Sequence, residues 1–209
     1  MESIRSRARE NLPSVLLTLL SIVQAIALET LWENTINRPE LVQVSWVATL
    51  GWLQVLVSFL IIILIWLFYV GLVMRFKWTP TITDLVLPFC VGLVELLLIW
   101  VMEPEDLGAW FLVLALITAM LHMVSHSLFR RARLDRENAE FFQHITPATW
   151  SDHVLKVLGI LFVVLVGVWL WVTGDTAWIA LFSLLTALLL IMFEIRIMAR
   201  FWRTSMGQG

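Results

Sequence analysis

The chain has 209 residues, of which 60% are hydrophobic and only 14% are charged, and its mean hydropathy is +0.90. A soluble globular protein is closer to half apolar and one quarter charged, so this composition excludes an ordinary soluble domain. The net charge of −2 gives no basic surface for nucleic acid, and a single cysteine, Cys90, excludes an internal disulfide.

Six apolar segments follow one another along the chain, and each is long enough to cross a hydrocarbon core of about 30 Å. They cover residues 14–32, 41–74, 85–102, 109–129, 154–172 and 177–197. The connections leave little chain for a soluble domain, so we treat residues 1–209 as a single transmembrane domain. The sequence therefore predicts an all-α polytopic membrane protein with six transmembrane helices.

Basic residues predict how these helices are oriented. They concentrate at the N-terminus, in the second and fourth connections and after the sixth segment, whereas the other three connections are mainly acidic, with Arg38 as their one basic residue. Loops rich in lysine and arginine remain in the cytoplasm. We therefore expect both termini on the cytoplasmic side of a membrane, and we assign that membrane to the bacterial cytoplasmic (inner) type.

One apolar segment and one connection do not fit a simple pattern of spans and short loops. The second segment, residues 41–74, would form a helix of about 51 Å, which favours one tilted or bent helix with an outer extension. The alternative is that residues 41–50 lie in the interface and the chain turns near Gly51. The connection at 130–151 is charged and then amphipathic, so we expect it to extend the fourth helix until Pro147, with residues 149–152 capping the fifth helix.

An offset of 68 residues aligns the third and fourth segments with the fifth and sixth. The aligned pairs include Asp84 with Asp152, Ala109-Trp110 with Ala177-Trp178, and Thr118-Ala119 with Thr186-Ala187. The first two segments fit the same pattern more loosely. We therefore predict three two-helix hairpins in the same orientation, at about residues 12–76, 83–131 and 151–201. Parallel repeats occur in transporters, but duplication also builds scaffolds, so the repeat describes architecture.

Glu95 is the clearest candidate for a working residue, because an ionisable group inside a spanning helix is a functional candidate by default. It lies about 16 Å along the third helix from Asp84 at 1.5 Å per residue, near the middle of the membrane. A carboxyl group there must be protonated, paired or in contact with water. It is either a proton or cation site, or a neutral side chain hydrogen-bonded to a neighbouring helix.

The first helix carries a polar stripe that can serve the same site. Its members are Ser14, Thr18, Ser21 and Gln24, with Glu29 slightly off line. Spacings of three and four place the first four on one face, and the repeat puts Gln24 at the depth of Glu95. Such a stripe either lines a water path or bonds across a helix interface, while Glu29 lies close enough to the outer surface to be solvated.

His122 and His126 lie four residues apart on one face of the fourth helix. Two histidines at this spacing can bind a metal but do not complete a site. A haem would need histidines on different helices, and we assign His144 and His153 to the cytoplasmic connection, so we predict no metal and no cofactor. A proton relay or gate remains open, and Glu194 takes the place of His126 in the repeat.

The leading hypothesis is a small channel or transporter that moves ions or protons. Six short helices leave little room for a pathway within one subunit, so we expect a homo-oligomer. The pathway candidates are Glu95, Gln24, Glu29, His122, His126 and Glu194. The alternative is a non-catalytic scaffold or sensor subunit that presents residues 130–150 to a cytoplasmic protein or to anionic lipid. A weaker alternative is a lipid- or haem-handling membrane enzyme.

Overall fold

The structure, a computed structural model, describes residues 2–78, 81–103, 105–143, 150–174 and 177–205. Within these residues the chain forms α-helices and two short 3₁₀ helices, with no strand. In chain order the elements are α1 (Glu2–Ile36), η1 (Pro39–Val42), α2 (Trp46–Arg75), α3 (Ile82–Trp100), α4 (Leu107–Leu134), η2 (Arg136–Asn138), α5 (Ala139–Gln143), α6 (Trp150–Thr173) and α7 (Trp178–Ser205).

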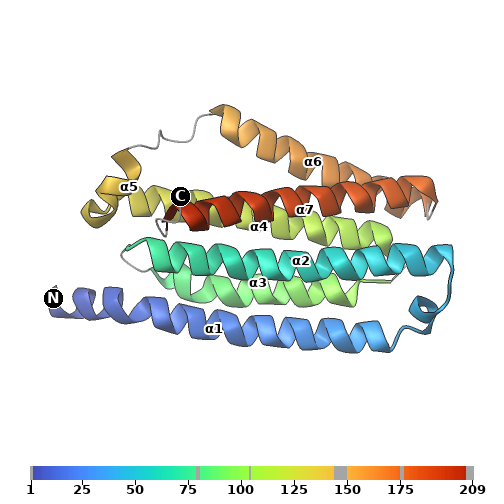
Figure 1. Ribbon diagram of the computed structural model, residues 1–209, viewed down its shortest axis with the longest axis horizontal. Coiled ribbons are helices and arrows are strands. Elements are labelled where there is room, and N and C mark those ends of the chain that lie inside the picture. Colours follow the sequence, from blue (N-terminus) through green and yellow to red (C-terminus); the bar gives the residue numbers. More distant parts are fainter. Residues whose placement is uncertain (1, 79–80, 104, 144–149, 175–176, 206–209) are drawn as a thin grey trace.

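Six helices in the described ranges are long and apolar enough to cross a membrane, which confirms the all-helical class and the six predicted spans. The spans are Glu10–Ile36, Trp46–Arg75, Ile82–Trp100, Leu107–Leu134, His153–Thr173 and Trp178–Arg203. The long helices lie alongside one another, and α1 begins at the same end of the bundle at which α7 finishes (Figure 1). We call this the basic end, because Arg75, Arg131 and Arg203 lie there in the last turns of α2, α4 and α7. The opposite end is the acidic end.

Helices α1 to α4 pack on one another in sequence order or nearly so, and α6 and α7 are each added to one helix of this group. Helix α1 packs on α2 and α3, α3 on α4, α4 on α6, and α2 on α7. Helices α1 and α6 lie on opposite sides of the bundle (Figure 1). Although α6 and α7 are consecutive, they contact each other little. Helix α6 instead packs on α4, and α7 packs on α2. The predicted repeat of three hairpins stays a prediction.

One continuous helix does run through Gly51 to the end of the second segment, but it starts later than predicted. The predicted start at residue 41 is wrong, because η1 is followed by an extended stretch and α2 starts only after Ser45. The Ser45 side chain caps α2 by accepting a 3.1 Å hydrogen bond from a first-turn backbone N–H. The alternative turn near Gly51 is also wrong, because Gly51 lies within α2 and faces Leu41 of η1.

The predicted cytoplasmic extension of α4 as far as Pro147 is also wrong. Helix α4 ends at Leu134, and Asp135 adopts an extended conformation with φ −87° and ψ 126°. The Asp135 carboxylate then accepts a 3.1 Å hydrogen bond from a backbone N–H of η2. Competition of this kind between an aspartate side chain and the helix ladder ends the helix. Pro147 and the side chains of the cap predicted at 149–152 lie outside what the structure describes.

The chain after α4 folds back over the basic end of the bundle. The Nδ2 atom of Asn138 donates hydrogen bonds of 2.6 Å to the Lys77 carbonyl and 2.7 Å to the Ala132 carbonyl. The ring of Phe76 meets four other phenylalanine rings, those of Phe129, Phe141, Phe142 and Phe201. The apolar side of this amphipathic segment is therefore used within the chain itself.

Helix α6 is held against α4 by two glycines that let the backbones approach. A Cβ atom at Gly108 would lie 2.4 Å from the backbone nitrogen of Trp171 and 2.8 Å from the carbonyl oxygen of Gly167. A Cβ at Gly167 would in turn lie 3.0 Å from Leu112 and 3.1 Å from the Gly108 carbonyl. Small residues at a crossing of membrane helices allow this close packing.

We expect Gly108→Ala to lower the stability of the protein by about 1–3 kcal/mol, because backbone atoms cannot rotate away from the added methyl group. The matched control is Gly159→Ala in α6, where nothing lies within 4 Å of the new Cβ. That variant should keep or raise the stability, since alanine favours a helix over glycine by about 1 kcal/mol. Thermal unfolding in detergent measures both, and equal midpoints for the two variants would refute the proposed crossing.

Candidate functional site

Glu95 of α3 and Gln24 of α1 form a buried polar pair in the group formed by α1 to α4. Glu95 is 0% exposed and Gln24 is 4% exposed. The Nε2 atom of Gln24 donates 2.9 Å hydrogen bonds to both carboxylate oxygens of Glu95. No basic side chain of the described residues forms an ion pair with Glu95. Because an unpaired buried charge is costly, this carboxyl group is suited to holding a proton.

A glycine allows α1 and α3 to approach at this pair. Gly92 lies three residues before Glu95, and a Cβ atom there would lie 2.3 Å from Cγ1 of Val23. A larger residue at Gly92 would therefore push α1 away from α3. Since Val23 adjoins Gln24 in the chain, the same contact sets the distance between the Gln24 amide and the Glu95 carboxylate.

Toward the acidic end, two more polar side chains bind backbone carbonyl groups on the α3 side. One belongs to α1, and the other follows shortly after the end of α1. Asn34 donates a 3.4 Å hydrogen bond from Nδ2 to the Ile99 carbonyl. Arg38, only 5% exposed, donates a 2.7 Å hydrogen bond from Nη1 to the Met102 carbonyl. It also forms a 2.6 Å ion pair with Glu40. The α1 side of the bundle is thus joined to the α3 side at three levels.

Helix α2 adds buried polar groups that the sequence analysis did not select. Gln54 and Ser58 are 0% exposed and lie one turn apart, and Tyr69 is buried closer to the basic end. Ser58 accepts a 3.2 Å hydrogen bond from Nε1 of Trp110. Several buried atoms have no hydrogen-bond partner among the described residues: both amide atoms of Gln54, the Tyr69 hydroxyl, Gln24 Oε1, Asn34 Oδ1 and Arg38 Nη2. Their position could have been predicted from the sequence, because Gln54 and Ser58 are polar residues spaced four apart within an apolar run.

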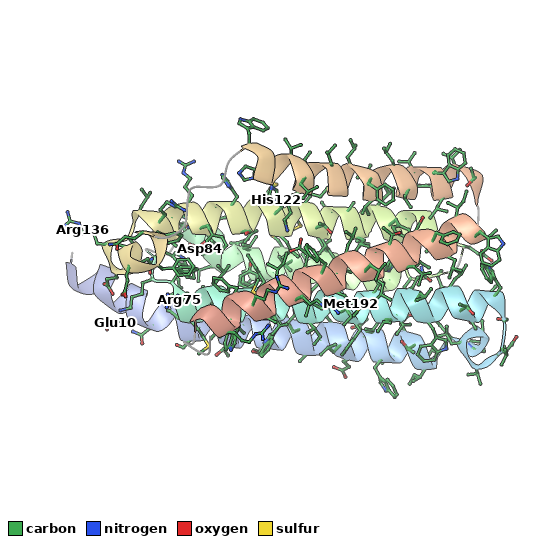
Figure 2. The ribbon with its side chains drawn as sticks, turned by 45° about the horizontal axis from the view of Figure 1, so that its top comes forward. Glu10, Arg75, Asp84, His122, Arg136 and Met192 are labelled. Carbon is green, nitrogen blue, oxygen red and sulfur yellow. The ribbon has the colours of Figure 1, made fainter. Side chains whose placement is uncertain are left out.

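Asp84 closes the series at the basic end. Its carboxylate accepts hydrogen bonds of 2.6 and 2.8 Å from Arg131 of α4, and one of 2.8 Å from the Thr81 backbone N–H. It therefore supports the start of α3 and also ties α3 to α4. Asp84 and Tyr69 line a cavity of about 10 Å³, and Figure 2 shows Asp84 at the same end as Arg75. We call the whole series the polar column: Arg38, Asn34, Gln54, Ser58, Gln24, Glu95, Tyr69 and Asp84.

The histidines lie in another part of the bundle, between α4 and α6, where Figure 2 shows His122. Nε2 of His122 lies 3.4 Å from Nδ1 of His153, and the ring centroids of His126 and His153 lie 4.7 Å apart. The assignment of His153 to the connection was wrong, because α6 already begins at residue 150. Glu194 of α7 pairs nearby with Lys156, which is one turn after His153.

The remaining candidates belong neither to the polar column nor to the histidine cluster between α4 and α6. Glu29 is exposed on α1, and its solvation stays a prediction. His144 falls outside the described residues. Within the described part of the chain, no group of three or more histidine, cysteine, aspartate or glutamate side chains is arranged to hold a metal ion. The polar column therefore carries the functional argument.

Comparison with known proteins adds no assignment. No protein-family model, no curated protein and no solved structure matches the chain. The function is accordingly inferred from the residues and contacts described above.

We expect Gln24→Leu to destabilise the protein by about 1–3 kcal/mol, because Glu95 then keeps no hydrogen-bond partner from α1. Adding Glu95→Leu should recover part of this loss, since replacing both partners with apolar groups removes the unsatisfied carboxyl group. Unfolding in detergent of the two single variants and the double variant gives the coupling energy. Strictly additive effects would show that the two side chains do not interact.

The Arg38–Glu40 pair predicts a pH dependence of stability. The hydrogen bond from Arg38 lowers the pKa of the Glu40 carboxyl group below its usual value. A carboxyl group with a lowered pKa in the folded state contributes stability above its unfolded pKa of about 4.3, and that contribution is lost as the pH falls through the folded pKa. The difference in melting temperature between the wild type and Glu40→Gln should therefore shrink from pH 7 to pH 3.

The control for this measurement is Glu105→Gln, which changes an exposed carboxylate at the same end of the bundle. Its melting temperature should follow that of the wild type at both pH values. A wild-type advantage over Glu40→Gln that is unchanged at pH 3 would contradict the stabilising role of the pair.

Proposed function

We propose that the protein is a small membrane channel or transporter that moves protons, with Glu95 as the proton-binding site and Gln24 as its partner. The observation that carries this proposal is a fully buried carboxyl group held by one amide and by no basic side chain of the described residues. Buried ionisable groups in membrane proteins mark proton relays and ion pathways.

The Gln24–Glu95 pair has hydrogen bonds available for both protonation states. When Glu95 is ionised, the Nε2 atom of Gln24 donates to both of its oxygens. When Glu95 carries a proton, its hydroxyl group needs an acceptor, and the buried Oε1 atom of Gln24 is unpartnered. Rotation of the amide would supply that acceptor, so the Glu95 carboxyl group keeps a hydrogen-bond partner in both protonation states.

The small cavity at the basic end of the polar column favours protons over larger ions. The cavity between Tyr69 and Asp84 measures about 10 Å³, which is room for about one water molecule. Protons can pass through hydrogen-bonded side chains and single waters, whereas a metal cation needs several oxygen ligands around it. The unpartnered atoms of Gln54, Asn34 and Arg38 offer hydrogen-bonding positions between Glu95 and the acidic end.

The proposal also includes orientation, assembly and a role for the histidines. The basic end faces the cytoplasm of a bacterial inner membrane, because loops rich in arginine and lysine remain on that side. The protein assembles as a homo-oligomer. His122 and His126, together with His153, act as a relay or gate near the basic end, where Glu194 lies with Lys156.

Proton flux into liposomes tests the central assignment. Glu95→Gln keeps the shape and hydrogen-bonding capacity of the side chain but cannot release a proton. We expect it to reduce flux by about 10²-fold or more, a loss typical of removing a proton-transfer group. Flux is measured with a trapped pH dye under an imposed membrane potential. The control is Glu29→Gln, an exposed carboxylate on α1, which should transport like the wild type.

Size-exclusion chromatography and thermal unfolding establish that Glu95→Gln remains folded and assembled. Wild-type flux from a folded Glu95→Gln variant would refute the proton site. Loss of the cellular function on deletion of residues 130–150, with Glu95 variants unaffected, would favour the scaffold or sensor alternative instead.

A further inference from the structure

A groove runs between α2 and α7 in the half of the bundle nearer the basic end. Its volume is about 350 Å³, within the range of about 300–1,000 Å³ seen for small-molecule sites. The lining is apolar apart from one charged side chain, and includes Trp66, Val70, Met198, Ala199, Trp202 and Arg203. Both helices belong to membrane spans, so an apolar groove on their surface is open to lipid.

The walls of the groove are held by direct packing of the two helices. A Cβ atom at Gly71 of α2 would lie 3.6 Å from Sδ of Met198 and 3.6 Å from Cε1 of Phe201. These contacts lie one residue from Val70 and set the separation of α2 and α7 beside the groove. The groove is therefore a consequence of packed helices rather than of a loop.

The groove is oriented like a lipid chain. Arg203 lies in the last turn of α7, and Met198 lies about 7 Å deeper at 1.5 Å per residue. On the facing helix, Trp66 lies about 13 Å from Arg75 at the end of α2. The groove thus extends from the membrane boundary toward the bilayer interior, parallel to the direction of an acyl chain.

The charge at its mouth favours an anionic headgroup. Arg196, Arg200 and Arg203 are spaced by four and three residues, so they follow one face of α7. Glu194, two residues before Arg196 on the same helix, pairs with Lys156 of α6. Arg203 is the point at which this basic stripe meets the groove, and Trp202 supplies an indole ring of the kind that sits at headgroup level.

We propose that the groove binds one anionic phospholipid, with an acyl chain between α2 and α7 and the headgroup phosphate at Arg203. Basic pockets between membrane helices recognise anionic headgroups in this way. The site is separate from the Gln24–Glu95 pair and does not depend on proton transport.

Native mass spectrometry of the delipidated protein, titrated with phosphatidylglycerol or phosphatidylcholine, tests the site. The wild type should bind one phosphatidylglycerol more tightly than phosphatidylcholine. Arg203→Gln should weaken phosphatidylglycerol binding about fivefold, the equivalent of about 1 kcal/mol. It should weaken phosphatidylcholine binding less, because the choline ammonium of that lipid already offsets the charge of its phosphate. Ala199→Leu fills the groove without changing the charge and should weaken binding of both lipids. Arg136→Gln, which removes an exposed arginine of η2 at the same end, is the matched control and should bind like the wild type.

Three results would overturn the proposal. The first is equal affinity of the wild type for the two lipids. The second is a loss in Arg136→Gln as large as that in Arg203→Gln, which would mean a diffuse surface charge. The third is a dimer that dissociates in Ala199→Leu, which would mean that a second copy occupies the groove. Arg203 is exposed, so its variant should fold and keeps the test decisive even where Ala199→Leu is unstable.

Discussion

Polar groups buried between membrane helices must find partners inside the protein, because the hydrocarbon offers none. The interface that joins α1 to α3 meets this constraint in part, through three contacts: Gln24 donates to Glu95, Asn34 to the Ile99 carbonyl and Arg38 to the Met102 carbonyl. One further polar atom on each of these three side chains has no partner among the described residues. A one-residue shift of α1 along α3 would break all three connections at once. The register of the two helices is therefore set by polar chemistry, while apolar packing fills the space between them. The polar column exists because this register places its members on the inner faces.

The remaining helices are added by a different kind of contact. Helix α6 meets α4 through Gly108 and Gly167, where backbone packs on backbone, and α7 lies along α2 beside Gly71. Contacts of this kind require small residues and no buried charge. They leave most of α6 and α7 exposed on the surface of the bundle, and they separate two helices that are neighbours in sequence. The lipid-facing groove on α7 and the histidine cluster on α6 are both results of this peripheral placement.

Local signals determined which predictions succeeded. Glu95 was selected because a carboxyl group inside an apolar run is conspicuous. Gln24 was selected as part of a polar stripe, but the other members of that stripe, Ser14, Thr18 and Ser21, are exposed in the structure. The start of the second helix was misjudged because its apolar residues continue across the break, and the cap formed by Ser45 is a single hydrogen bond. His153 was misplaced because α6 starts four residues earlier than its hydropathy indicated. Gln54 was missed because its burial depends on which side of α2 faces the other helices.

The amino-acid sequence by itself determined the number of spans, their approximate limits and the difference in charge between the two ends. These properties depend on the transfer of each segment from water to hydrocarbon, which is summed over neighbouring residues and needs no knowledge of packing. Only the tertiary structure decided that Gln24 reaches Glu95, that His153 joins His122, and that α6 packs on α4 whereas α7 packs on α2. Those outcomes depend on side-chain contacts between segments distant in the chain, where a single glycine such as Gly92 sets how closely two helices approach. The prediction of a working carboxyl group thus became a specific proposal only when the structure supplied its partner.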